Sequence, residues 1–201
     1  MAKIKICGLY RNEDIEYVNK AKPDYCGFIV DFPKSHRNVS PERLKELAAG
    51  VSGDIKRVGV FVDEAPETVA RLLADGVIDI AQLHGHEDEA YISLLRQRVP
   101  GCIIWKAFKV REAGDLAAAQ SSTADMVLLD NGYGTGKCFD WTLAQKFDRE
   151  FILAGGLTPE NIPEALVAMK PYAVDISSGV ETDKIKDRSK MLAAVSAVRE
   201  A

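Results

Sequence analysis

Two residues of the sequence could exchange protons with a substrate, the thiol of Cys7 and the carboxyl of Asp130. Cys7 follows residues 3–6, whose alternation of polar and apolar side chains is typical of a half-buried strand, and Gly8 ends that pattern. Asp130 ends the apolar run of residues 126–129 and leads into a glycine-rich stretch that could fold over a ligand as a lid. Each group is therefore expected at the C-terminal tip of a strand.

Small residues follow the last two predicted strands in a pattern that suits a phosphate group. Glycines let backbone N–H groups approach an anion closely, and the late loops of a barrel together with a helix N-terminus commonly hold phosphate. We therefore expect a phosphorylated small molecule as the ligand. The candidate phosphate-binding residues are Gly155, Gly156, Ser177, Ser178 and Gly179.

The elements that must position these groups alternate between strand and helix along the whole chain. Strands are predicted over residues 3–6, 25–30, 57–62, 78–83, 102–108, 126–129, 151–153 and 173–176. Helices are predicted over 12–21, 40–49, 66–75, 87–98, 112–119, 141–146, 159–169 and 187–200, with caps at Asn12 and Ser40. Eight such units favour a closed (β/α)8 TIM barrel over an open doubly wound α/β sheet. We expect a single domain over residues 1–201.

Composition excludes several classes of protein. The chain has 201 residues, of which 47% are hydrophobic, and its net charge of -4 without a basic stripe argues against nucleic-acid binding. No apolar run is long enough to cross a membrane, and we expect a cytoplasmic protein without a signal peptide. The cysteines at positions 7, 26, 102 and 138 form no CxxC pair and are predicted to be free thiols. Cys26 and Cys102 are expected in the core.

Short motifs occur in order along the chain at the predicted strand ends: Lys5-Ile-Cys-Gly8, Ser35-His-Arg37, Val58-Gly-Val-Phe-Val62, Gln82-Leu-His-Gly85, Leu129-Asp130, Gly134-Thr-Gly136 with Phe139-Asp-Trp141, Ala154-Gly-Gly-Leu157 with Pro159-Glu-Asn161, and Asp175-Ile-Ser-Ser-Gly-Val-Glu181. Together they resemble the phosphoribosylanthranilate isomerase family of tryptophan biosynthesis. One departure concerns the loop after the eighth strand, where residues 181–187 contain no glycine or proline.

The resemblance implies an Amadori rearrangement of N-(5-phosphoribosyl)anthranilate to 1-(o-carboxyphenylamino)-1-deoxyribulose 5-phosphate, with no metal and no organic cofactor. It also implies that Cys7 is the base and Asp130 the acid. A free thiol has a pKa near 8.5, so a nearby positive charge must favour the thiolate, and Lys5 or Arg37 could supply it. The acid must be protonated when it acts, which we expect to require removal from water by the bound substrate.

Three further side chains are predicted to bind the substrate. Arg37 offers a planar cationic fork for the anthranilate carboxylate or its ring. His84 either contacts the ligand or is a structural hydrogen-bonding residue, and Asp175 either reaches the sugar hydroxyls or orients groups of the first strand. His36 and His86 are expected to face solvent, and the histidine spacing does not suggest a metal site.

Two alternatives remain open on the sequence alone. One is another phosphosugar isomerase on the same barrel, against which Cys7 argues because the related histidine-pathway enzyme uses aspartates for both roles. The other is a phosphate-ligand binder without catalysis, against which the presence of both Cys7 and Asp130 argues. The oligomeric state, monomer or homodimer, is left open.

Overall fold

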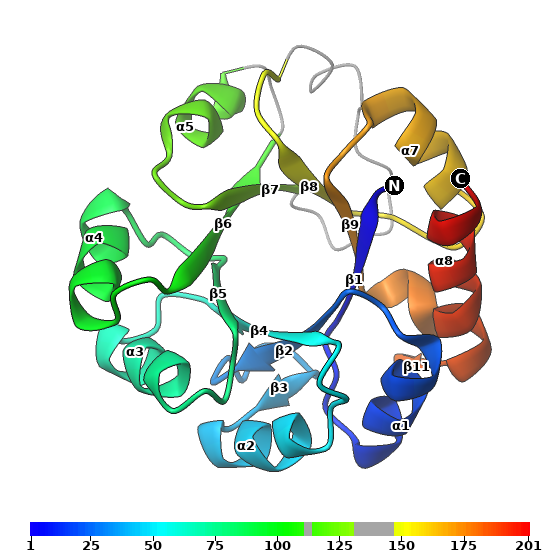
Figure 1. The fold of residues 1–201 in the computed structure, drawn as a ribbon, viewed down its shortest axis with the longest axis horizontal. Helices are drawn as coiled ribbons and strands as arrows, with labels where there is room; N and C mark the ends of the chain where they lie inside the picture. Colours follow the sequence, from blue (N-terminus) through cyan, green and yellow to red (C-terminus); the bar gives the residue numbers. More distant parts are fainter. Residues whose placement is uncertain (111–113, 131–146) are drawn as a thin grey trace.

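Eight parallel strands form a closed ring in the computed structural model, which describes residues 1–110, 114–130 and 147–201 (Figure 1). In the order of hydrogen bonding they run β1, β9, β8, β7, β6, β5, β4, β2, and β2 pairs with β1 to close the ring. The predicted (β/α)8 barrel is therefore confirmed. The strands are β1 (Lys3–Cys7), β2 (Tyr25–Val30), β4 (Lys56–Phe61), β5 (Ile80–Leu83), β6 (Ile103–Lys109), β7 (Met126–Asp130), β8 (Phe151–Ala154) and β9 (Ala173–Ile176).

Seven α-helices of the described residues cover the outside of the ring (Figure 1). They are α1 (Asn12–Ala21), α2 (Pro41–Ala49), α3 (Pro66–Ala74), α4 (Glu89–Arg98), α5 (Asp115–Ser121), α7 (Ile162–Met169) and α8 (Arg188–Glu200). Four further elements are short: β3 (Asn38–Val39), the 3-10 helix η1 (Ser178–Val180), β10 (Glu181–Thr182) and β11 (Ile185–Lys186). The helix predicted over 141–146 and the lid predicted after Asp130 lie outside the described residues.

Local capping explains where the first two helices begin. Ser40 caps α2 as predicted, because its side chain accepts a hydrogen bond from Arg43 N and Pro41 occupies the first turn. The cap predicted at Asn12 is wrong, since α1 is capped one residue earlier, at Arg11. There the fully buried Asp14 carboxylate accepts hydrogen bonds from the backbone N–H groups of residues 10 and 11, which would otherwise lack an acceptor at the start of the helix.

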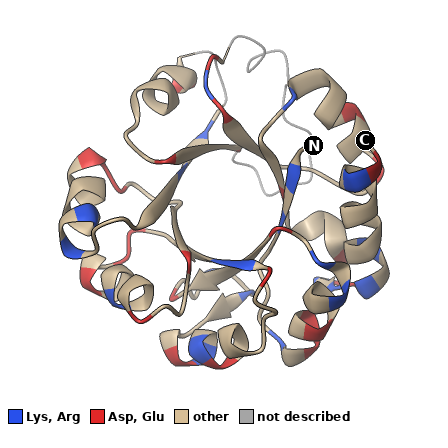
Figure 2. Ribbon diagram, in the orientation of Figure 1, with Lys and Arg blue, Asp and Glu red and all other residues tan. Residues whose placement is uncertain are grey.

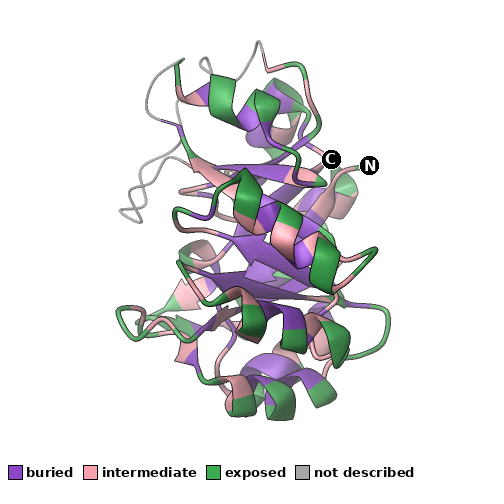
Figure 3. Ribbon diagram, turned by 90° about the vertical axis from the view of Figure 1, so that its left-hand side faces the viewer, coloured by how far each residue is buried: buried purple, intermediate pink, exposed green. Residues whose placement is uncertain are grey.

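Hydrophobic side chains form two layers, one inside the ring of strands and one between the strands and the helices. The side view shows the strands buried through the middle and the helices exposed on their outer faces, with both chain ends at one end of the barrel (Figure 3). Cys26 is fully buried in the outer layer as predicted. Cys102 directly precedes β6 and therefore lies outside the strand in which it was predicted. Its side chain is only partly buried. The inner layer comprises Tyr25, Val58, Ile80, Trp105, Leu128, Ile152, Ala154 and Ala173.

Charged residues of both signs are spread over the outer helices (Figure 2), which agrees with the small net charge of -4. Within the described part of the chain, no helix is both long enough and apolar enough to cross a membrane.

Candidate active site

A cavity of about 420 Å³ lies where the strands end at the C-terminal side of the barrel. A hollow of about 840 Å³ lies at the opposite end, against both chain ends, and none of the predicted site residues lines it. We therefore take the smaller cavity as the candidate site. It is lined by nine predicted residues: Cys7, Arg37, His84, Asp130, Gly155, Gly156, Asp175, Ser177 and Ser178.

Cys7 ends β1 inside the barrel, beside a buried ion pair. The period of two along β1 points Lys5 and Cys7 to the same side. Lys5 is fully buried, and its Nζ donates to Asp175 Oδ2 on the neighbouring β9 at 2.9 Å. Cys7 itself is 7% exposed, which leaves the thiol just within reach of the cavity.

Burial and charge act in opposite directions on the thiol. Burial raises the pKa of Cys7, the Lys5 ammonium opposes this, and the pKa stays above its ordinary value. Burial also works against the Lys5 ammonium, but Asp175 and Cys7 outweigh it and raise the pKa of Lys5. Of the two cations considered from the sequence, Lys5 has the larger effect on the thiol, although Arg37 also interacts with Cys7 and the buried Lys186 also lowers the pKa of Cys7. The Lys5 ammonium reduces the rise in the pKa of Cys7 that burial causes, but it does not cancel that rise.

Two glycines make room for these groups. A Cβ on Gly27 of β2 would lie 2.8 Å from Cys7 Sγ and 2.9 Å from Lys5 Cε, closer than side chains allow. Gly8 has a φ of +80°, and a Cβ there would lie 2.4 Å from Arg37 Cδ. The glycine of the Lys5-Ile-Cys-Gly8 motif therefore allows the Arg37 side chain to cross the mouth of the barrel beside Cys7.

His84 connects a buried glutamine to Asp130. Gln82 Nε2 lies 3.2 Å from His84 Nδ1, and His84 Nε2 lies 3.6 Å from Asp130 Oδ2. When the Gln82 amide donates, a neutral imidazole carries its proton on Nε2, the atom that faces Asp130. His84 is thus placed beside the candidate acid, and Gln82 is a cavity residue that the sequence analysis had not selected.

A second buried ion pair supports the loop that follows His84. Glu87 accepts hydrogen bonds from the backbone N–H groups of Asp63 (2.7 Å) and Gly85 (2.9 Å), and Lys106 Nζ binds its Oε2 at 3.0 Å. Charge-assisted bonds to buried backbone donors fix such a loop strongly. His86 points outward, 95% exposed, and His36 is also exposed, so both predictions for these histidines are confirmed.

The two loops predicted to bind phosphate lie against each other. Gly155 and Gly156 adopt φ values of +93° and +69°, and their backbone N–H groups donate no hydrogen bond to any described residue. Gly179 does not line the cavity. A Cβ there would lie 1.9 Å from Leu157 O, so its role is to let the loop after β9 approach the loop after β8.

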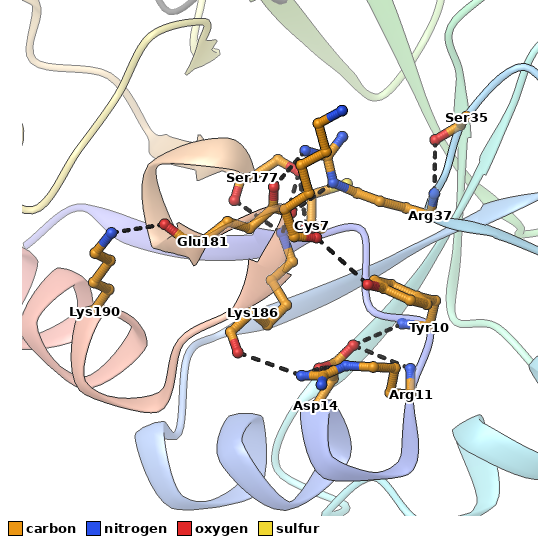
Figure 4. Close-up of polar contacts among 11 residues, drawn as sticks. Cys7, Tyr10, Arg11, Asp14, Ser35, Arg37, Ser177, Glu181, Lys186 and Lys190 are labelled. Atoms are coloured by element: carbon orange, nitrogen blue, oxygen red, sulfur yellow. Dashed lines mark hydrogen bonds and ion pairs between the residues drawn. The ribbon is translucent and has the colours of Figure 1, made fainter.

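Arg37 reaches the cavity from the loop after β2, and a carboxylate already binds it. Its Nε and Nη2 donate to the two oxygens of Glu181 at 2.6 and 2.7 Å (Figure 4). Burial opposes ionisation of Glu181, but Arg37 and Lys186 outweigh it and lower the pKa of Glu181 to about 2. Glu181 and Lys186 are functional candidates that the sequence analysis had not selected, because the chain separates Glu181 from Arg37 by 144 residues.

Apart from Ser35, the rest of the cavity wall is apolar. Apolar walls with a few convergent polar groups are typical of sites for small molecules that carry an aromatic ring. Within the described ranges, no cluster of three or more His, Cys, Asp or Glu side chains could hold a metal ion. The apolar lining residues are Ile29, Phe32, Val60, Val62, Ala154 and Leu157.

Comparison with known proteins identifies the family. Residues 4–197 match the family model described as N-(5'phosphoribosyl)anthranilate (PRA) isomerase. The chain belongs to this family. The N-(5'-phosphoribosyl)anthranilate isomerase of Clostridium kluyveri is 46% identical over 202 residues, which cover 99% of this chain and 98% of the relative. That of Endomicrobium trichonymphae is 41% identical over 204 residues and 99% of both chains. The family and the isomerase class predicted from the sequence are confirmed.

Solved structures agree with this assignment to the phosphoribosylanthranilate isomerase family. The enzyme of Thermotoga maritima superposes with a TM-score of 0.87 at 34% identity, with complete coverage of both chains. Another member of the family, with a TM-score of 0.87 at 32% identity and complete coverage of both chains, was solved in complex with reduced 1-(o-carboxyphenylamino)-1-deoxyribulose 5-phosphate. The thiamine phosphate pyrophosphorylase of Pyrococcus furiosus, at 14% identity, shares the fold only.

Proposed function

We propose that Cys7 and Asp130 are the base and the acid with which this isomerase converts N-(5-phosphoribosyl)anthranilate to 1-(o-carboxyphenylamino)-1-deoxyribulose 5-phosphate in tryptophan biosynthesis. One observation carries the proposal: the buried thiol and the carboxyl line the same cavity, together with the glycine loops after β8 and β9. The other carboxyl that lines the cavity, Asp175, is ion-paired with Lys5 at 2.9 Å, which makes it a poorer proton donor than Asp130.

The chemistry needs one proton donor and one acceptor at opposite ends of the reacting atoms. Asp130 protonates the furanose ring oxygen, which opens the ring to a Schiff base. The Cys7 thiolate then removes the proton from C2, and the resulting enolamine becomes the ketone when C1 gains a proton and the C2 hydroxyl loses one. Two protons are gained and two are lost, so the step is a balanced isomerisation without a co-reactant.

Binding roles follow from the atoms that the cavity offers. The N–H groups of Gly155 and Gly156, which donate to no described residue, are proposed to hold the phosphate together with Ser177 and Ser178. Asp175 Oδ1 and Gln82 Oε1 are buried without a hydrogen-bond partner among the described residues, and both side chains line the cavity. We assign these two oxygens to substrate hydroxyls, because a buried acceptor is stabilised when a ligand supplies the missing donor.

The aromatic end of the substrate is assigned to the other side of the mouth. Arg37 is proposed to bind the anthranilate carboxylate, and the ring would pack on the apolar wall that includes Phe32. His84 is proposed to orient the Asp130 carboxyl through its Nε2 rather than to take a proton itself.

We also propose a cellular compartment and a choice of two oligomeric states. A thiol base works only while it stays reduced, which favours the cytoplasm. A relative from Thermotoga maritima is described as monomers generated from a dimeric enzyme, so both a monomer and a homodimer have precedents. Sedimentation analysis of the purified protein decides between them.

The direct test is turnover of freshly made N-(5-phosphoribosyl)anthranilate by the wild type, Cys7→Ala and Asp130→Asn. Each variant is expected to lose about 10²–10⁴-fold in kcat, since each removes one acid–base group, while binding of the reduced product is retained. Cys26→Ala is the matched control, because Cys26 is a buried thiol outside the cavity. Normal kcat in Cys7→Ala would overturn the assignment of the base.

A further inference from the structure

The Arg37 guanidinium is held by only one of its two edges. A guanidinium can bind two oxygens side-on, through Nε and one Nη, or end-on, through both Nη atoms. Glu181 occupies the side-on edge at 2.6 and 2.7 Å, and no other described residue takes a hydrogen bond from the end-on edge. Arg37 lines the cavity, whereas Glu181 and Lys186 do not. The carboxylate therefore binds Arg37 from behind and leaves the outer edge to a ligand.

Lys186 holds Glu181 from the other side. Its side chain is fully buried, and its Nζ donates to Glu181 Oε1 at 2.8 Å and to Ser177 O at 2.8 Å (Figure 4). A buried ammonium is costly unless several acceptors surround it, and here the cross-strand pairing of β10 with β11 places Glu181 directly opposite Lys186. The hairpin thus exists in the one register that brings these charges together.

The hairpin is itself fastened to its surroundings. Lys190, on helix α8, donates from Nζ to the carbonyl oxygen of Glu181 at 2.7 Å (Figure 4). Arg11, at the start of α1, donates from Nη2 to the carbonyl oxygen of Lys186 at 3.4 Å. Ser177 Oγ, held by Lys186, donates to the carbonyl oxygen of Cys7 at 3.0 Å. The same buried lysine therefore connects the Arg37 pair to the backbone of the candidate base.

The charges of this cluster do not cancel. One carboxylate, Glu181, lies between two cations, Arg37 and Lys186, so the cluster has a net charge of +1 beside the cavity. Purely structural ion pairs have no need of an excess cation, whereas a site for an anionic group does. A guanidinium whose rotamer is already fixed also loses less entropy when it binds a carboxylate.

We propose that Glu181 and Lys186 are positioning residues that hold the Arg37 fork ready for the carboxylate of the substrate. This inference rests on the proposed role of Arg37. It adds that the specificity for a carboxylated aromatic ring depends on two residues that do not touch the substrate and that come from the hairpin β10–β11.

Two stable ligands separate positioning from general stability. One is reduced 1-(o-carboxyphenylamino)-1-deoxyribulose 5-phosphate, and the other is the same compound without its carboxylate. Calorimetric titration measures both Kd values for the wild type, Glu181→Gln, Lys186→Gln and Arg37→Ala. Glu16→Gln removes an equal charge from an exposed position on α1 and serves as the control.

We expect Glu181→Gln and Lys186→Gln to raise the Kd of the carboxylated ligand by about tenfold or more, because a charge-assisted contact loses its fixed geometry. The Kd of the ligand without the carboxylate should stay within about twofold of the wild type, since that ligand makes no such contact. In the Arg37→Ala background, adding Glu181→Gln should change neither Kd further. Equal losses for both ligands would mean a merely structural role and would overturn the inference.

The same titrations separate this inference from the proposed role of Arg37. Equal losses for both ligands in Arg37→Ala would overturn the role of Arg37 itself. If Arg37→Ala weakens binding of the carboxylated ligand alone while Glu181→Gln leaves both Kd values unchanged, only the positioning by Glu181 is overturned. If Glu181→Gln does not fold, Glu181→Asp keeps the charge but withdraws the carboxylate from Arg37, and the same selective loss is expected of it.

Discussion

At the scale of single residues, the proposed reactivity of Cys7 depends on the charges that surround its buried thiol. Cys7 is buried, which favours the neutral thiol, and the Lys5 ammonium beside it favours the thiolate. Lys5 can stay charged there because Asp175 binds it at 2.9 Å. The three side chains thus form one electrostatic unit, in which one oxygen of Asp175 has no hydrogen-bond partner among the described residues.

Replacing Lys5 tests this unit. Lys5→Met should raise the pKa of the Cys7 thiol further and reduce kcat/KM at neutral pH by about tenfold or more, since one pKa unit is a factor of ten in thiolate. Because the pKa of Cys7 already lies above its ordinary value, kcat/KM of the wild type should rise as the pH increases beyond neutrality, and this rise should occur at higher pH in the variant. The rate of alkylation of Cys7 against pH measures the shift directly.

The control for this prediction concerns stability. Lys5→Met leaves Asp175 buried without its cation, which costs about 3–5 kcal/mol of the free energy of unfolding. Lys5→Met/Asp175→Asn should recover much of that stability without restoring the thiolate. An unchanged alkylation profile in a folded Lys5→Met variant would contradict the role of Lys5.

Sequence patterns predict residues at strand tips better than they predict their partners. Cys7 and Asp130 could be found because an apolar strand ends at each, and all strands of a parallel barrel end on the same side. The pairing of Lys5 with Asp175 across 170 residues follows only from the closure of the barrel between β1 and β9. Glu181 and Lys186 were missed because no local period indicates which carboxylate will face Arg37.

At the scale of elements, the hairpin β10–β11 replaces the loop that the sequence analysis found unusual. Its two-residue turn is Asp183-Lys184, with φ values of +51° and +64°. Positive φ at both central positions is typical of a type I′ turn, which usually contains asparagine and glycine. The sequence analysis could not predict this hairpin, because the usual turn residues are absent and the buried pair of Glu181 with Lys186 specifies the register instead.

This turn predicts a stabilising change. Asp183→Asn/Lys184→Gly should stabilise the protein by about 1 kcal/mol, because left-handed backbone costs an ordinary residue about 1–2 kcal/mol and costs glycine little. In a chain of this length the melting temperature should rise by about 2–4 °C. Asp183→Ala/Lys184→Ala is the matched control, since it removes the same two charges but keeps the strained φ values. A gain in this control equal to that of the first double variant would show that charge, and not backbone conformation, is responsible.

At the scale of the whole molecule, the barrel allows its site to contain buried charges that a small core could not tolerate. Lys5, Lys106 and Lys186 are all buried, and each binds a carboxylate at 3.0 Å or less. Lys5 and Lys106 lie on the barrel strands β1 and β6, whereas Lys186 lies on β11 of the hairpin. The stability of the fold and the electrostatics of the site are therefore coupled through pH.

Acid unfolding should reveal this coupling through Glu181. Its pKa is lowered from 4.5 to about 2 in the folded protein, so the stability it contributes is present above pH 4.5 and is lost as the pH falls towards 2. This contribution is about 3 kcal/mol. In Glu181→Gln, the free energy of unfolding measured in urea should therefore fall less steeply between pH 4.5 and 2 than in the wild type. Glu16→Gln, at an exposed carboxylate on α1, should keep nearly the wild-type slope, and identical slopes in all three proteins would show that the buried cluster does not govern acid unfolding.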